Sequence, residues 1–222
     1  DALRPHLTPG GYDDVEEMLT DRRYHLDQVR KLLTECEVFI FTLGLTEAWV
    51  SKKDGTVYPI CPGVAGGVFS YNDYEFVNFG VGDVYEDLIA FDKAIRGVNP
   101  NVKVMLTVSP VPLVATATDG HVLTATTYSK SVLRVAADQF VRAVPDSYYF
   151  PSFEIITGSY NRGRYFADDL RSVTEDGVNH VMRLFFKNLT EDGTVPSYMP
   201  ETVVVDSHTL KMAKVVATSC DE

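Results

Sequence analysis

The stretch Val38-Phe-Ile-Phe-Thr-Leu-Gly-Leu-Thr-Glu-Ala-Trp49 joins a continuous apolar run to a polar segment. The run from Val38 to Leu43 is typical of a strand that is buried on both faces of a sheet. Gly44 ends the run, and the candidate site residues that follow are Thr46, Glu47 and Trp49. Because ligands of open α/β sheets bind just beyond the carboxyl ends of the strands, we expect a site at this point.

Helix and strand signals alternate along the chain on both sides of this stretch. Apolar periodicity predicts helices over about 13–36, 81–98 and 129–143, and a last one from 174 onward. Further strands are expected at 102–108 and, frayed by Pro151, at 148–155. This order favours an α/β fold: a three-layer α/β/α arrangement with a mostly parallel sheet of the flavodoxin type.

Two other regions have distinct patterns. Asp54-Gly55 lies between two β-prone runs and predicts a hairpin over 50–60. Beyond 189 the pattern weakens, so we expect one domain over 1–189 and an extension over 190–222. That extension contains a β-prone run at 202–206, and a short helix is expected near 211–217.

Charge and composition exclude several classes of protein. The formal net charge of −11 argues against binding a nucleic acid through its phosphates and favours a neutral or weakly charged ligand. The glycine-rich stretch 62–67 lacks a nucleotide-binding spacing, and the three cysteines lack metal-ligand spacing, so no cofactor and no metal are expected. No apolar run is long enough to span a membrane, and the cysteine usage favours a reducing cytoplasm.

Polar residues also follow the later strands. Ser109 comes directly after the strand at 102–108, and a loop near the end of the domain carries Asp169, Arg171 and Ser172. Parallel strands end at the same edge of a sheet, so these residues are expected to converge on the site after Leu43. The alternative is that they are ordinary polar loop ends without a function.

Five blocks of sequence resemble the GSCFA domain family from near residue 1 to about 189. They are Phe41-Thr-Leu-Gly-Leu-Thr-Glu-Ala-Trp49, Ser109-Pro-Val-Pro-Leu113, Tyr128-Ser-Lys-Ser-Val-Leu-Arg134, Tyr149-Phe-Pro-Ser-Phe-Glu-Ile155 and Asp169-Leu-Arg-Ser-Val173. This family resembles the SGNH (GDSL-type) hydrolases, which have a flavodoxin-like sheet. The resemblance implies an esterase, lipase or acyltransferase, often one that acts on acetyl groups of glycans.

The resemblance also implies a mechanism with a serine nucleophile, an oxyanion hole and an Asp-x-x-His pair. The block Gly-Ser-Cys-Phe-Ala, which would carry the serine, does not occur in this sequence. We therefore expect it upstream of Asp1, in a longer protein. The sheet should then expose an unpaired edge beside the strand at 38–43, where a missing N-terminal segment or a second chain could associate.

The oxyanion block of SGNH enzymes, Gly-x-Asn-Asp, is replaced here by Gly44-Leu-Thr-Glu47. Thr46 stands where the asparagine would donate, and its hydroxyl can still donate one hydrogen bond. An ionised Glu47 would repel an oxyanion, so it is expected to bind substrate hydroxyls or to hold the loop.

The last block departs further from the family pattern, because Asp169-Leu-Arg-Ser172 has serine where histidine is expected. His180 lies two helical turns later, about 12 Å along the helix. His180 and His121 are the two candidate bases, and the alternative for each is an ordinary surface or capping role. Arg171 is expected to organise its loop.

Other residues have both functional and structural interpretations. Lys130 and Arg134 lie four apart on one helical face and either bind an anionic group or pair at the surface with Asp138. Tyr128, Tyr149 and Trp49 either stack on a sugar or belong to the core.

The function that we expect is a serine hydrolase or O-acyltransferase acting on an O-acylated, carbohydrate or other small-molecule substrate. The alternative is a catalytically incompetent chain that binds glycan or has a structural role.

Overall fold

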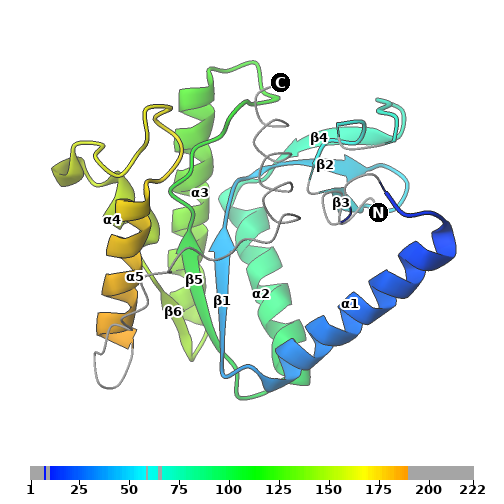
Figure 1. Ribbon diagram of the computed structural model, residues 1–222, viewed down its shortest axis with the longest axis horizontal. Coiled ribbons are helices and arrows are strands. Elements are labelled where there is room, and N and C mark those ends of the chain that lie inside the picture. Colours follow the sequence, from blue (N-terminus) through cyan, green and yellow to red (C-terminus); the bar gives the residue numbers. More distant parts are fainter. Residues whose placement is uncertain (1–7, 9–10, 59, 65–66, 190–222) are drawn as a thin grey trace. The chain divides into compact units, whose positions relative to one another are not determined.

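A computed structural model describes residues 8, 11–58, 60–64 and 67–189 (Figure 1). The chain divides into two compact units, which we describe separately. The hairpin unit contains Ala48–Val77 and the described residues up to Val29. The sheet unit contains Arg30–Glu47 and the described residues from Asn78 onward. The expected extension over 190–222, with its β-prone run and short helix, lies outside the described residues.

The sheet unit is built on three parallel strands in the order β1-β5-β6. They are β1 (Val38–Leu43), β5 (Lys103–Val108) and β6 (Ser147–Tyr149). Val38 pairs with Lys103 and Leu43 with Val108, so β1 and β5 end at the same level. The helices of this unit are α2 (Val81–Val98), α3 (Val122–Ala143), α4 (Ser152–Thr157), the 3-10 turn η1 (Ser159–Asn161) and α5 (Glu175–Leu189).

The main core lies between this sheet and the helices α2 and α3. Val104, Leu106 and Val108 alternate along β5, and each is 0% exposed. They belong to one cluster with Leu88 and Ile95 of α2 and Leu133 and Phe140 of α3. Because side chains alternate across a strand, Thr107 faces the other side, where its hydroxyl lies 2.5 Å from that of Ser152 in α4. Helices therefore pack on both faces of the sheet, and the fold is α/β, as predicted.

The expectation that the strand at 38–43 is buried on both faces is wrong for the described structure. β1 is an edge strand, and Val38, Ile40 and Phe41 are 43%, 48% and 39% exposed. Among the described strands, β5 alone pairs with β1, which makes β1 an edge of this sheet.

The hairpin unit contains the predicted hairpin. β2 (Glu47–Ser51) pairs with β3 (Val57–Tyr58) in an antiparallel ladder, and Gly55 at the turn has a φ of 73°. β4 (Tyr74–Asn78), which the sequence did not predict, completes a sheet in the order β3-β2-β4. Helix α1 (Val15–Glu35) begins in this unit and continues into the sheet unit, and none of its residues is buried.

Two element boundaries were predicted incorrectly. The strand expected at 148–155 ends at Tyr149, and Pro151 then caps the amino end of α4. The helix expected from Ser129 begins at Val122, where His121 is the N-cap. In the described part of the chain, no helix is both long and apolar enough to cross a membrane.

Candidate functional site

The loop after β1 and the loop after β5 begin side by side at the carboxyl edge of the sheet. The backbone N–H of Ser109 donates a 2.9 Å hydrogen bond to the carbonyl of Leu43. The Ser109 Oγ accepts a hydrogen bond from the backbone N–H of Val111. Gly44 is exposed, and a Cβ added there would meet no atom within 4 Å. The rim of the sheet is therefore open at Gly44.

Thr46 anchors this loop from within the protein. It is 1% exposed, its backbone N–H donates to Ser129 Oγ at 2.9 Å, and its hydroxyl donates to Asn78 Oδ1 at 2.7 Å. The carbonyl of Thr46 accepts the backbone N–H of Phe79. Both donors of Thr46 are thus engaged, so the residue positions its loop and has no proton left for an oxyanion.

Asn78, which the sequence analysis did not single out, supplies a carboxamide at this position. It is the last residue of β4, it is half-buried, and its Oδ1 accepts the proton of Thr46. The Nδ2 group makes no hydrogen bond with another described residue. The available signal was the β-prone run at 74–77 that ends in a polar residue before Phe79-Gly80. A carboxamide from the end of β4 is therefore held beside the loop that contains Thr46.

Lys130 and Ser129, neighbours on α3, hold the two ends of the loop. The Lys130 ammonium donates a 2.7 Å hydrogen bond to the carbonyl of Gly44. The residue is 3% exposed, and burial lowers the pKa of Lys130 to about 8. The surface-pair interpretation of Lys130 is therefore wrong. Arg134 instead forms ion pairs with Glu154 at 2.8 Å and with Asp138 at 3.6 Å.

Glu47 holds a second loop at the same edge. Its carboxylate accepts hydrogen bonds from the Thr116 hydroxyl at 2.5 Å and from the backbone N–H of Ala117 at 3.0 Å. These contacts agree with the loop-holding role and occupy both carboxylate oxygens. Trp49 belongs to the hairpin unit, where its ring packs against Phe69 and Phe76.

The Asp169–Ser172 segment forms a closed turn. The Asp169 carboxylate accepts the Ser172 hydroxyl at 2.5 Å and the backbone N–H groups of Arg171 and Ser172 at 2.9 and 2.8 Å. The Ser172 hydroxyl and these N–H groups lower the pKa of Asp169. Leu170 takes a positive φ of 56°, and the buried Nε of Arg171 has no hydrogen-bond partner among the described residues. The carboxylate is thus satisfied within its own turn.

No hydrogen bond or ion pair joins either candidate imidazole to Asp169 among the described residues. The His121 Nδ1 accepts the backbone N–H of Leu123 and caps α3. This bond places the proton of the neutral ring on Nε2, so His121 would have to leave the cap before it could accept a proton from a serine. The His180 ring stacks on Tyr165, with a centroid distance of 5.3 Å and an interplanar angle of 21°.

The predicted aromatic sugar-stacking residues also have different surroundings. Tyr149 donates to Glu154 and lies beneath the Arg134 guanidinium, which is 4.1 Å from the ring centroid. Burial and Glu154 raise the pKa of the Tyr149 phenol. Tyr128 is 46% exposed. Among the described residues, no group of His, Cys, Asp and Glu side chains is arranged to hold a metal ion.

The structure therefore brings together Gly44, Thr46, Ser109 and Lys130 with Ser129 and Asn78, whereas no described hydrogen bond links Asp169, His121 or His180 to them. Comparison with curated proteins and with solved structures finds no match. The sequence model of the GSCFA family matches residues 4–185. This match covers most of the chain, which therefore belongs to the GSCFA family.

Proposed function

We propose that this chain forms the oxyanion side of a serine hydrolase or O-acyltransferase site that acts on O-acyl groups, with a carbohydrate as the acyl carrier. The observation that supports this role is the hydrogen bond from the Thr46 hydroxyl to Asn78 Oδ1. It orients the carboxamide and leaves both Nδ2–H groups as donors. Positioned N–H donors stabilise the negative charge that develops on an acyl carbonyl oxygen.

The reaction that this arrangement would serve is acyl transfer through a covalent intermediate. A serine Oγ attacks the acyl carbonyl, its proton passes to an imidazole, and the carbonyl oxygen becomes the oxyanion held by Asn78. The sugar alkoxide leaves with the proton from the imidazole. Water or an acceptor hydroxyl then takes the acyl group. We assign the serine to a Gly-Ser-Cys-Phe-Ala block, which residues 1–222 do not contain, and the base to His121 or His180.

The second candidate is a catalytically incompetent glycan-binding or structural module. The observation that favours it is the closed turn at Asp169, whose oxygens accept bonds from Ser172 and Arg171 and not from an imidazole. The capping bond of His121 supports the same interpretation.

The deciding experiment uses a natural protein that carries both this chain and the Gly-Ser-Cys-Phe-Ala block. The hydrolase proposal predicts covalent labelling by a fluorophosphonate probe and release of acetate from acetylated xylo-oligosaccharides. Absence of labelling in a folded protein would overturn the serine mechanism and leave the binding module. If the protein is labelled, His121→Ala and His180→Ala are compared, and both base candidates are wrong if neither change slows turnover.

The role of Asn78 has a separate test. Asn78→Asp keeps the shape of the side chain but removes the Nδ2 donors, and kcat should fall about 100- to 1000-fold. Thr46→Val removes the hydroxyl that orients the amide and should lower kcat by a smaller factor. The control is Asn188→Asp on the exposed end of α5, which should leave kcat unchanged. Equal rates for Asn78→Asp and the control would contradict the oxyanion role.

A further inference from the structure

The hairpin unit contains a cluster of aromatic rings that the proposed reaction does not use. Its six members are Trp49, Tyr58, Phe69, Tyr71, Tyr74 and Phe76. Trp49 and Tyr58 are paired across β2 and β3, so both lie on the same face of the small sheet. Phe69 connects the rings, with centroids 4.9 Å from Trp49, 4.7 Å from Tyr71 and 6.2 Å from Tyr74.

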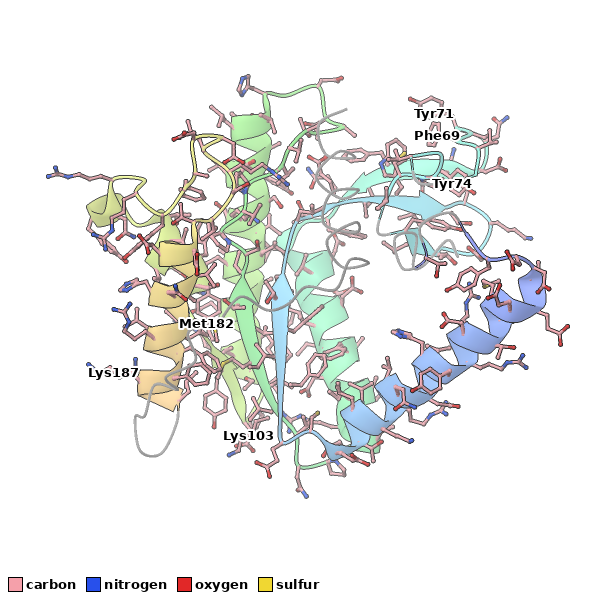
Figure 2. All side chains as sticks on the ribbon, viewed as in Figure 1. Phe69, Tyr71, Tyr74, Lys103, Met182 and Lys187 are labelled. Atoms are coloured by element: carbon pink, nitrogen blue, oxygen red, sulfur yellow. The ribbon has the colours of Figure 1, made fainter. Side chains whose placement is uncertain are left out.

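Tyr71 is the outermost ring of this cluster. It is 76% exposed, whereas Trp49, Phe69, Tyr74 and Phe76 are half-buried. Figure 2 shows Phe69, Tyr71 and Tyr74 gathered at one end of the hairpin unit. The edge-to-face contact between Phe69 and Tyr71 supports the Tyr71 ring, most of which remains exposed to solvent. An exposed ring held by a packed ring is a preformed stacking surface.

The backbone that carries Tyr71 is fixed by local hydrogen bonds. The carbonyl of Ser70 accepts the N–H groups of Asp73 and Tyr74, at 3.0 and 2.9 Å, and Ser70 Oγ accepts the N–H of Asn72. The Lys52 ammonium donates a 2.6 Å hydrogen bond to the carbonyl of Tyr71. The ring is therefore presented by an ordered turn, which reduces the entropy lost when a ligand binds.

Two polar residues follow Tyr71 on the same turn. Asn72 and Asp73 are exposed, and their side chains make no hydrogen bond with another described residue. They offer amide donors together with amide and carboxylate acceptors, on residues adjacent to Tyr71 in the sequence. Sugars combine an apolar C–H face with a rim of hydroxyls that both donate and accept hydrogen bonds. This combination of groups matches that chemistry better than it matches a purely apolar ligand.

We propose that Tyr71, with Asn72 and Asp73, binds a neutral oligosaccharide, whose pyranose ring stacks on Tyr71. The net charge of −11 argues against a polyanionic ligand. Among the aromatic residues described between 48 and 77, Tyr71 alone is exposed, and the others are half-buried. One open ring suits a small ligand, because a stable protein interface buries about 800 Å² per partner. The site does not depend on the proposed acyl transfer, so either proposal can fail without the other.

The test is an NMR titration of the full chain with cellotetraose, xylotetraose and chitotetraose. Saturable shifts are expected at the backbone amides of Tyr71 and Asn72 for at least one of these sugars. Tyr71→Ala should weaken binding about tenfold, whereas Tyr71→Phe keeps the ring and should stay within about threefold. The matched control is Tyr24→Ala, an exposed tyrosine on α1, which should bind as the wild type does.

Two results would overturn the proposal while the variants remain folded by circular dichroism. One is the absence of saturable shifts with all three sugars. The other is equal affinity of Tyr71→Ala and the wild type. Sedimentation tests whether this face is a protein interface instead. That alternative holds if the chain binds no sugar and self-associates with rising concentration, and if Tyr71→Ala abolishes the self-association.

Discussion

The Lys130 ammonium donates a 2.7 Å hydrogen bond to the carbonyl oxygen of Gly44, and its side chain enters the protein from the first half of α3. Ser129, the preceding residue, accepts the backbone N–H of Thr46. Two consecutive residues of one helix thus fix both ends of the exposed loop that follows β1. The loop is therefore held by buried polar contacts, one of them from a lysine that is 3% exposed.

The first prediction concerns how stability changes with pH. Burial lowers the pKa of Lys130 from 10.5 to about 8, so between these values the unfolded chain binds a proton that the folded chain has released. The free energy of unfolding should therefore rise with pH across this window. Below pH 8 the Lys130 amine is protonated in both the folded and the unfolded state. The cost of burying this charge then lowers the free energy of unfolding by its full amount, roughly 3 kcal/mol.

The measurement compares urea unfolding of the wild type and Lys130→Met at several pH values. Other groups titrate equally in both proteins, so the stability of the wild type relative to Lys130→Met should increase from pH 8 to 10.5. Lys103→Met, at an exposed position labelled in Figure 2, is the control and should lack this increase. A difference that stays constant with pH would contradict the lowered pKa of Lys130.

A second prediction tests the closed turn at Asp169. The Ser172 hydroxyl is the largest of the contributions that lower the pKa of the Asp169 carboxyl below 3.8. Such a carboxylate stabilises the turn above its unfolded pKa, and the effect is lost as the pH falls through the lowered value. Ser172→Ala should raise the pKa of Asp169 toward 3.8 in a carbon-detected NMR titration. The control is Ser159→Ala, at another exposed serine, which should leave the pKa of Asp169 unchanged.

The third prediction compares two helical glycines. Gly177 in α5 is buried, and a Cβ there would lie 2.9 Å from Val173 Cγ1 and 3.0 Å from Tyr165 Cβ. Gly177→Ala should therefore lower the free energy of unfolding by about 1–3 kcal/mol, despite the better helix propensity of alanine. Gly97 in α2 is exposed with no atom within 4 Å of the added Cβ, so Gly97→Ala should stabilise by about 0.5–1 kcal/mol. If chemical denaturation shows that both substitutions change the free energy of unfolding in the same direction, the close packing around Gly177 is refuted.

Local sequence signals predicted the elements whose determinants are local. The Asp54-Gly55 turn, the helix at 81–98 and the buried strand that became β5 all depend on short patterns. Lys130 was misassigned although it lies on the same helical stripe as Leu133, Ala137 and Phe140, all of which are buried. That spacing was visible in the sequence and marks Lys130 as a position on the buried face.

Other parts of the site could not be predicted from the sequence because they depend on contacts between distant segments. Thr46 and Asn78 are 32 residues apart, and their hydrogen bond forms only when β4 ends beside the loop after β1. Pro151 was interpreted as a break in a strand, whereas it is the N-cap residue of the short helix α4. Proline suits a helix start as well as a strand edge, so its local signal is ambiguous.

The last prediction concerns the edge strand, whose apolar sequence suggested burial on both faces. Leu106 in β5 is 0% exposed, and Leu106→Ala should lower the free energy of unfolding by about 2–5 kcal/mol. Ile40 in β1 is 48% exposed, so Ile40→Ala should lower it by about 1 kcal/mol or less. Urea unfolding measures both. A loss at Ile40 equal to that at Leu106 would contradict its exposed position. If that loss disappears when the protein is diluted, another chain covers β1 in solution, since an association weakens with dilution whereas an intramolecular contact does not.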